Sequence, residues 1–477
     1  MKTILQYVTF VTLTILVPLS CSEDAMDKVD TNHNDPTEVP IKLILPQTIM
    51  STVFGLSGND LAWFSSVFVE QTTGVHGQLE DADKRRAINT TMLNNIWNEM
   101  FQTNIDLDYI IERGSEDGEE EGYWAAVGIA KFLKAYNFSL ATDAWGSIPF
   151  SEAGQGSENR TPVFENEQAV YDGIFKLVNE AIGDMQKTSV GNPGNVDFIY
   201  GGDMDLWIKA AHGFKARCFN RLSNVGPESY TDSVIASSAL SFADASESFI
   251  FNQFNTSATG QSPWYQEEND RGHHAVSKTI DDIMVSLNDP RRTLWFATID
   301  DEIIPAPNGT AISDQAHNIY SRISFDYLTA LSPMPVITYD EIKFLEAEAL
   351  LRKGMTEEAN TSYLTAVEEA LLRAEVAETD IITYLEQGNV NVGSSNLTKQ
   401  TILTQKYISF WLFQPIEAFS EYRRTGVPVL QNPLGLPPNR FPYGNDEVAS
   451  NPNVPDITYQ TKPVSYTHLT LPTKRIV

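Results

Sequence analysis

The sequence predicts a mostly α-helical protein built of helix pairs, with long irregular insertions between them. Apolar side chains recur every three or four residues over long segments, which is the period of helices with one buried face. Between these segments, stretches rich in Gly, Pro and polar residues show no period, and we expect little strand in them. Loops of such length in a compact chain are usually functional. These stretches are residues 57–91, 145–165, 186–203, 245–335 and 427–464.

The N-terminus has the features of an export signal. Lys2 precedes the apolar run Ile4–Leu19, which is too short and too interrupted by Thr and Pro18 to predict a membrane-spanning helix. Cys21 comes directly after a serine, an arrangement that resembles a bacterial lipoprotein signal whose cysteine is acylated. We therefore expect residues 1–20 to be removed and Cys21 to carry the lipid. Pro18 stands where such signals usually have an aliphatic residue, so a plain secretory signal with an incidental cysteine is the alternative.

A flexible acidic tether is expected over residues 21–40. This segment is polar and acidic, and it cannot bury enough apolar surface to fold by itself. Its run Ser22–Asp24 resembles the acidic tag that directs some lipoproteins to the outer face of the outer membrane. The sequence therefore predicts a lipid-anchored protein that faces the outside of the cell.

Four helices are predicted in the first half of the chain. Residues 92–114 place apolar side chains along one stripe, and residues 122–146 are rich in small residues, as in a helix packed on two sides. Residues 166–185 and 203–222 repeat the apolar period, which puts Cys218 in the core as a small hydrophobic side chain. The stripe of the first helix comprises Leu93, Trp97, Met100, Phe101, Ile105 and Ile111.

Two helix pairs are predicted in the second half. The first pair occupies residues 339–354 and 356–376, with Gly354 ending one helix and Thr356 capping the next. Small residues in the second helix allow the two to approach closely, which is the signature of a tetratricopeptide-like hairpin. The second pair lies in residues 398–426.

The composition excludes several classes of function. A formal net charge of −30 argues against nucleic acid, whose phosphates need stripes of Lys and Arg. The two cysteines, Cys21 and Cys218, cannot form a disulfide framework or a zinc cluster. The adjacent His273 and His274 raise the possibility of a metal ion, but neighbouring histidines on one loop seldom both ligate, so a solvated or hydrogen-bonded pair is favoured. We expect no cofactor.

Five stretches form an ordered set of motifs. They are LATDAWGSIPFSEA (140–153), DPRRTLWF (289–296), MPVITYDEIKFLEAEALLRKG (334–354), QKYISFWLFQPIEAFSEYRRTGVPVL (405–430) and NRFPYGNDEVASNPN (439–453). In this order they resemble the SusD/RagB family of outer-membrane lipoproteins, in particular its second SusD-like subgroup. The resemblance implies an α/α superhelix of tetratricopeptide-like helix pairs over residues 41–464. The basic string at residues 465–477 is instead similar to a vector-derived read-through tail.

The resemblance also implies a function. Members of this family capture oligosaccharides, or in some cases peptides, at the cell surface and pass them to a SusC-like TonB-dependent transporter barrel, without catalysis. In agreement, the sequence has no nucleophile elbow, phosphate-binding loop, zincin motif or dinucleotide fingerprint. A peptide-binding relative remains an alternative. So does an α-helical glycoside hydrolase, because the 63 acidic residues supply many carboxylate pairs.

Two loops are predicted to bind the ligand, VEQTTGVHGQ (69–78) and SPWYQEENDRGHH (262–274). The scaffold helices need their aromatic residues for packing, so the ligand is expected at the loops. Sugars present apolar C–H faces edged with hydroxyls, so their sites combine aromatic rings with polar side chains. We hypothesise that the loops converge on one exposed face with Trp264 or Tyr265 as the stacking platform. Alternatively, Trp264 plugs its own insertion. The candidate residues are Gln71, His76, Trp264, Tyr265, Arg271 and His273.

Two further motifs are interpreted as structural. Trp145 in DAWGSIPF could contact the ligand. We favour a structural role, in which the indole ring holds this loop against the scaffold. Arg423 and Arg424 are expected to serve the end of their helix or nearby carboxylates.

Overall fold

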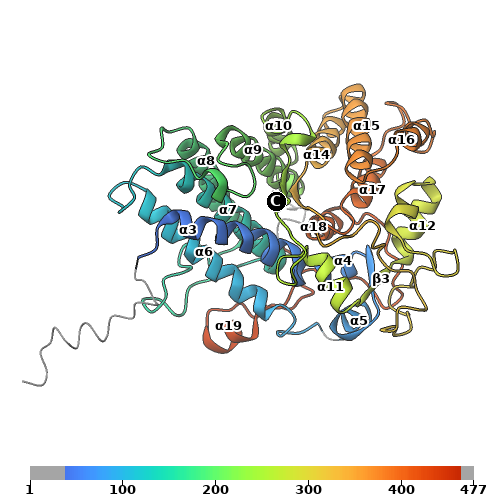
Figure 1. Ribbon diagram of the computed structural model, residues 1–477, viewed down its shortest axis with the longest axis horizontal. Helices are drawn as coiled ribbons and strands as arrows, with labels where there is room; N and C mark the ends of the chain where they lie inside the picture. The colour runs from blue at the N-terminus through green and yellow to red at the C-terminus, as the bar shows by residue number, and fades with distance from the viewer. Residues whose placement is uncertain (1–37, 87, 464–477) are drawn as a thin grey trace, which may run out of the picture. The chain divides into compact units, whose positions relative to one another are not determined.

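The computed structural model describes residues 38–86 and 88–463, which are mostly helical, as the sequence predicts (Figure 1). From Ile41 onward they belong to one compact unit. The predicted signal, Cys21, most of the tether and residues 465–477 lie outside the described residues. The helices are α3 (Ile41–Met50), α4 (Asp60–Phe68), α5 (Gly77–Asp83), α6 (Asn94–Gly114), α7 (Trp124–Trp145), α8 (Glu167–Met185), α9 (Met204–Arg221), α10 (Pro227–Ala239), α11 (Pro263–Asp270), α12 (Lys278–Leu287), α13 (Arg291–Trp295), α14 (Tyr339–Arg352), α15 (Thr356–Arg373), α16 (Glu378–Leu385), α17 (Lys399–Ser409), α18 (Pro415–Thr425) and α19 (Asn445–Ser450).

Four short strands form two small antiparallel sheets within the described chain. One sheet pairs β1 (Thr72–Gly74) with β3 (His274–Val276), and the other pairs β2 (Phe249–Phe251) with β4 (Met334–Ile337). Each sheet joins segments far apart in the sequence, so the strands tie the insertions to the helical scaffold.

The scaffold is a succession of helices that pack on their neighbours in the chain. Helix α6 packs on α7, α7 on α8, α8 on α9 and α9 on α10, and α14 packs on α15 in the second half. Nearly every residue of α7 is buried, as expected for a helix covered on two sides. Gly128 shows how close the approach is, because a Cβ there would lie 2.5 Å from Cγ of Met185 on α8. Ile105, predicted to face the core from α6, is instead 37% exposed.

The ends of the second-half helices agree largely with the prediction. Gly354 follows α14 with a φ of +81°, a conformation that glycine adopts without strain. The N-cap of α15 is Met355 rather than Thr356, which is already the first helical residue. The reason is the short connection, in which the Met355 N–H turns back to the carbonyl of Leu350. Helix α18 begins at Pro415 and packs chiefly on α4.

Several helices lie in segments for which no helix was predicted. Helices α4 and α5 occupy part of 57–91, and α11, α12 and α13 occupy part of 245–335. Helix α4 is buried on nearly all sides, so its sequence lacks the one-sided apolar period of a surface helix. The helices α11 to α13 are short, and short helices depend on tertiary packing rather than on their own sequence. Helices α3 and α16 are likewise short, and α10 was also not predicted.

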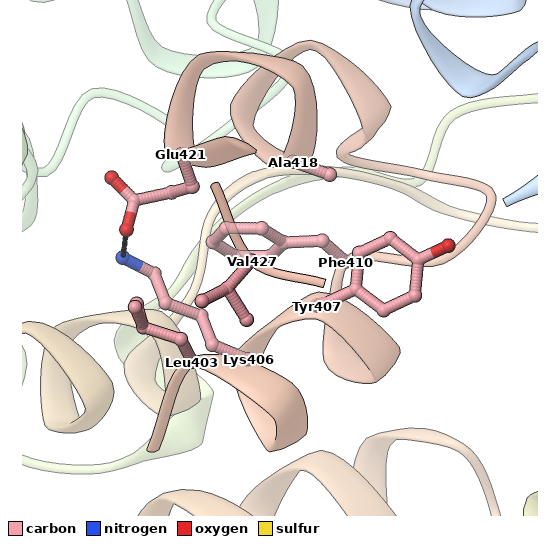
Figure 2. Close-up of a pocket in the computed structure, with 7 residues that line it drawn as sticks. All are labelled: Leu403, Lys406, Tyr407, Phe410, Ala418, Glu421 and Val427. Carbon is pink, nitrogen blue, oxygen red and sulfur yellow. Dashed lines mark hydrogen bonds and ion pairs between the residues drawn. The ribbon is translucent and has the colours of Figure 1, made fainter. Parts of the chain in front are cut away.

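A network of buried charges joins α14, α17 and α18. The Arg424 guanidinium donates to both carboxylate oxygens of Glu348 at 2.8 and 2.7 Å, and to Glu421 at 3.0 and 2.7 Å. Lys406 donates to the same Glu421 at 3.1 Å (Figure 2). Burial alone would raise the pKa of Glu421, but Arg424 and Lys406 lower it to about 2. The structural interpretation of Arg424 is thus confirmed.

A small cavity lies beside this network, between α17 and α18. Its volume is about 10 Å³, and its walls include Phe410, Tyr407 and Val427 (Figure 2). This is the room that a single water molecule needs, and Lys406 on the wall offers it a hydrogen-bond donor. The cavity is too small for a sugar, so it is not itself the ligand-binding site.

Candidate ligand-binding site

The β1–β3 sheet brings the two predicted ligand-binding segments together. Thr72 pairs with Val276 and Gly74 pairs with His274. Just beyond the ends of the strands, the rings of His76 and His273 approach with their centroids 4.9 Å apart. The segments that carry these two histidines therefore lie side by side, although about 200 residues separate them in the sequence.

Trp264 does not offer a stacking platform, so this part of the hypothesis is wrong. Pro263 is the first residue of α11, in a segment interpreted as having no helical period. The phase of this helix turns the Trp264 ring inward, where it is fully buried 5.2 Å from the ring of His274. The alternative, that Trp264 plugs its own insertion, agrees with this burial.

Gln71 is also buried and serves the scaffold. Its side-chain amide donates to the carbonyl of Tyr407 at 2.9 Å, and its own carbonyl accepts from the Trp411 indole at 3.1 Å. Both partners belong to the segment of α17 and the turn after it. An exposed loop was expected here, but Gln71 is enclosed because the buried helix α4 directly precedes it.

Tyr265 and Phe325 form an aromatic pair at the surface. Their ring centroids are 5.5 Å apart with an interplanar angle of 62°, and Phe325 is 52% exposed while Tyr265 is half-buried. The Ser262 N–H donates to the Ala330 carbonyl at 2.9 Å, which fixes α11 against the loop that carries Phe325. Sequence reasoning missed Phe325, although its position between Ser and Asp in a non-periodic segment was a signal for exposure.

Polar side chains border the aromatic pair along α11. Asn269 and Asp270 are exposed at the end of the helix, and the Arg271 side chain is 65% exposed. Asn269 follows Tyr265 by four residues and therefore shares its face of the helix, whereas Arg271 lies about 9 Å along the axis from Tyr265 and on another side. The edge of α11 therefore combines an aromatic face with hydrogen-bond donors and acceptors, which is the chemistry that a sugar requires.

Beneath α11 lies a group of buried titratable side chains. Burial raises the pKa of Glu267 to about 7, although His274 and Arg271 act to lower it. Burial and the neighbouring His76 lower the pKa of His273 to about 4, so this imidazole is neutral at pH 7. His274 faces Glu268 with Nδ1 2.9 Å from the carboxylate. As predicted for the histidine pair, His274 is hydrogen-bonded.

As the side chains stand, no three His, Cys, Asp or Glu groups in residues 38–86 and 88–463 are grouped to hold a metal ion. Over the same ranges, no helix combines the length and the apolar composition that crossing a bilayer requires.

Comparison with known protein families shows to which family the chain belongs. The model of a SusD-like family, described as starch-binding and associating with the outer membrane, matches residues 34–444. This chain belongs to the SusD-like family.

Solved structures of SusD-like proteins share the fold. A SusD/RagB family protein from Bacteroides thetaiotaomicron is 27% identical, with a TM-score of 0.79 over 87% of this chain and 95% of its own. A chitin-binding SusD homologue from Flavobacterium johnsoniae is 19% identical, with a TM-score of 0.72 over 86% of this chain and 93% of its own. No curated protein matches.

The motifs that carry the SusD-like resemblance lie mostly in the core. Trp145 is fully buried and donates its indole N–H to the Pro442 carbonyl at 2.9 Å, as the structural interpretation requires. Arg291 is fully buried against Asp289, to which it donates at 2.9 and 2.5 Å. These motifs thus specify the SusD-like scaffold, whereas the aromatic pair lies outside them.

Proposed function

We propose that this SusD-like protein is a non-catalytic glycan-binding lipoprotein of the cell surface, which passes oligosaccharides to a SusC-like TonB-dependent transporter. The observation that carries the proposal is the family match over residues 34–444, to a family described as starch-binding and associating with the outer membrane. The chitin-binding homologue with the same fold supports a carbohydrate as the ligand.

The aromatic pair is the proposed platform for the sugar. Tyr265 and Phe325 expose ring faces at one edge of α11, where the apolar C–H side of a pyranose can stack. Arg271 at the end of the same helix and the half-buried His76 and His273 below it are proposed to bind the hydroxyls. This retains four of the predicted ligand residues and replaces Trp264 with Phe325.

Replacing Tyr265 and Phe325 together with Ala is expected to weaken glycan binding by about 1–3 kcal/mol, if stacking here is comparable to that of bases on aromatic side chains. Because Phe325 is half exposed, the thermal stability should change little. Isothermal titration calorimetry against oligosaccharides of starch and chitin would measure the affinity.

The half-buried Phe175 of α8, which stacks on Phe219 with centroids 4.5 Å apart, offers a matched control. Phe175→Ala should leave glycan affinity unchanged. Equal affinities of the wild type and the Tyr265/Phe325 double variant would place the binding face elsewhere. Measurable release of reducing ends would instead support the hydrolase, and binding to peptides alone would support the peptide-binding relative.

Cys21 is proposed to carry the lipid that holds the protein at the outer membrane. Replacing Cys21 with Ala should release the protein from the membrane fraction, because stable anchoring depends on more than one acyl chain. Fractionation of cells that lack the transporter partner would test this without retention by the barrel. Continued membrane retention of the variant in those cells would contradict the proposal.

A transporter barrel is the proposed protein partner, and the tether with a broad helical face is proposed to contact it. Interfaces of lasting complexes bury thousands of Å² and survive mild extraction. We therefore expect a complex of the two proteins when native membranes are extracted with mild detergent. Recovery of the monomer alone, by size-exclusion chromatography, would argue against a lasting complex.

A further inference from the structure

The proposed glycan site is assembled from three segments that are far apart in the sequence. His76 follows β1, and Phe325 lies in the loop before β4. Arg271 and His273 lie in the short connection between α11 and β3. Connecting segments of this kind are more mobile than the elements that they join. The site therefore depends on contacts that hold the three segments together.

Arg322 makes such contacts with a side chain that is only 10% exposed. Its Nη1 donates to the carbonyl of Gly272 at 3.1 Å and to the carbonyl of His274, the two neighbours of His273 in the sequence. Its Nη2 donates to the carbonyl of Asp314 and, at 3.0 Å, to the carboxylate oxygen Oδ2 of the same residue. One planar guanidinium therefore joins the α11–β3 connection to the segment of Asp314.

Asp314 extends this connection to the segment of His76. Its N–H donates to the carbonyl of Val75 at 3.1 Å, one residue before His76. Its carboxylate accepts from the N–H groups of residues 318–320 at 3.0 to 3.4 Å. Burial would raise the pKa of Asp314, but these N–H groups and Arg322 lower it, so the carboxylate stays ionised at neutral pH. Arg322 and Asp314 together therefore join the segments of both histidines.

The backbone that follows Arg322 leads directly to Phe325. The Arg322 carbonyl accepts from the N–H of Ala297 at 2.9 Å, and the N–H of Ser324 donates to the Trp295 carbonyl at 2.8 Å. Phe325 is the next residue after this hydrogen-bonded stretch. The position of Arg322 therefore helps to determine where the Phe325 ring lies against α11.

We propose that Arg322, paired with Asp314, is a positioning residue of the glycan site, which fixes the segments of His273 and Phe325 before the sugar binds. The inference rests on the proposed function and adds to it a residue that acts through the ligand contacts. Binding to loops that are already ordered avoids the entropy cost of ordering them, so such a residue raises the affinity. Arginine suits this task because its donors lie in one rigid plane, whereas lysine offers a single flexible ammonium group.

Arg322→Lys tests the inference, because it keeps the positive charge and removes the planar set of donors. The affinity of the full mature protein for maltoheptaose and chitotetraose would be measured by calorimetry. We expect it to fall several-fold, and by no more than the roughly 5- to 150-fold that loss of stacking itself would cause. Arg292→Lys is the matched control, since Arg292 donates to Asp281 at 2.7 and 3.2 Å elsewhere in the same insertion. Its affinity should equal that of the wild type.

A double-mutant cycle separates positioning from a general loss of stability. If Arg322 acts through Phe325, Arg322→Lys should lower the affinity much less in a Phe325→Ala background than in the wild type. Should Arg322→Lys fail to fold, Asp314→Asn takes its place with the same expectation.

Equal losses in the two backgrounds, or wild-type affinity in Arg322→Lys, would overturn the role of Arg322 and leave the glycan site standing. Absence of binding by the wild type to both oligosaccharides, or wild-type affinity in the Tyr265/Phe325 double variant, would instead overturn the proposed site and this inference with it.

Discussion

Arg424→Met is expected to lower the free energy of unfolding by about 3–5 kcal/mol, because it removes the strongest cationic partner of two buried carboxylates and leaves them with Lys406 and the more distant Lys399. Arg424 is the shared partner of Glu348 and Glu421, and all three side chains are buried. Methionine fills much of the same volume, so the loss reports on charge rather than on a cavity. Urea unfolding followed by far-UV circular dichroism would measure it.

Arg86→Met provides the matched control. The Arg86 side chain is 57% exposed and its ion pair to Asp81 spans 3.8 Å. Exposed pairs of this kind contribute about 0–1 kcal/mol. If Arg424→Met proves as mild as the control, the network does not depend on Arg424.

Trp145→Ala is expected to destabilise the protein by about 3–5 kcal/mol, as large-to-small changes of a buried tryptophan do. The Trp145 ring packs edge-on against Trp97 with centroids 5.1 Å apart. Its indole N–H also satisfies the carbonyl of Pro442, which the substitution would leave without that donor. Chemical denaturation of the purified variant would provide the value.

Trp145→Phe is the companion variant, since it keeps an aromatic ring and loses only the hydrogen bond and part of the volume. Trp145→Phe should lower the free energy of unfolding clearly less than Trp145→Ala does. Under conditions in which Trp145→Ala is folded, its glycan affinity should equal that of the wild type. A loss of glycan affinity in a variant of normal stability would instead support the alternative interpretation, that Trp145 contacts the ligand.

Most of the long helices could be predicted because their burial is one-sided and therefore visible as a period. Helices such as α6 and α8 show this clearly. Helix α7 is buried on nearly all sides and was predicted from its small residues over a long segment, whereas α4, also buried on nearly all sides, has only nine residues and neither signal. Ile105 marks a finer limit, because it lies beside the buried face of α6, which continues through Asn104, Leu107 and Ile110.

The candidate site was predictable only in part. Loop composition pointed to the segments of His76 and His273, and the structure places these side by side. Which aromatic ring faces solvent depends on the phase of α11, set by its start at Pro263, and on the loop that packs against it. Phe325 therefore occupies the exposed position that residue type alone suggested for Trp264.

The contacts that connect the first third of the chain to residues 407–442 bear on when the protein can fold. Gln71 is hydrogen-bonded to Tyr407 and Trp411, and Trp145 to Pro442. These partners are separated by 297 to 340 residues in the sequence. A chain with such high contact order cannot complete its core until synthesis is almost finished. The early helices then lack their partners while the nascent polypeptide is still being made. That delay would suit the proposed export of the chain, because an export channel accepts an unfolded polypeptide.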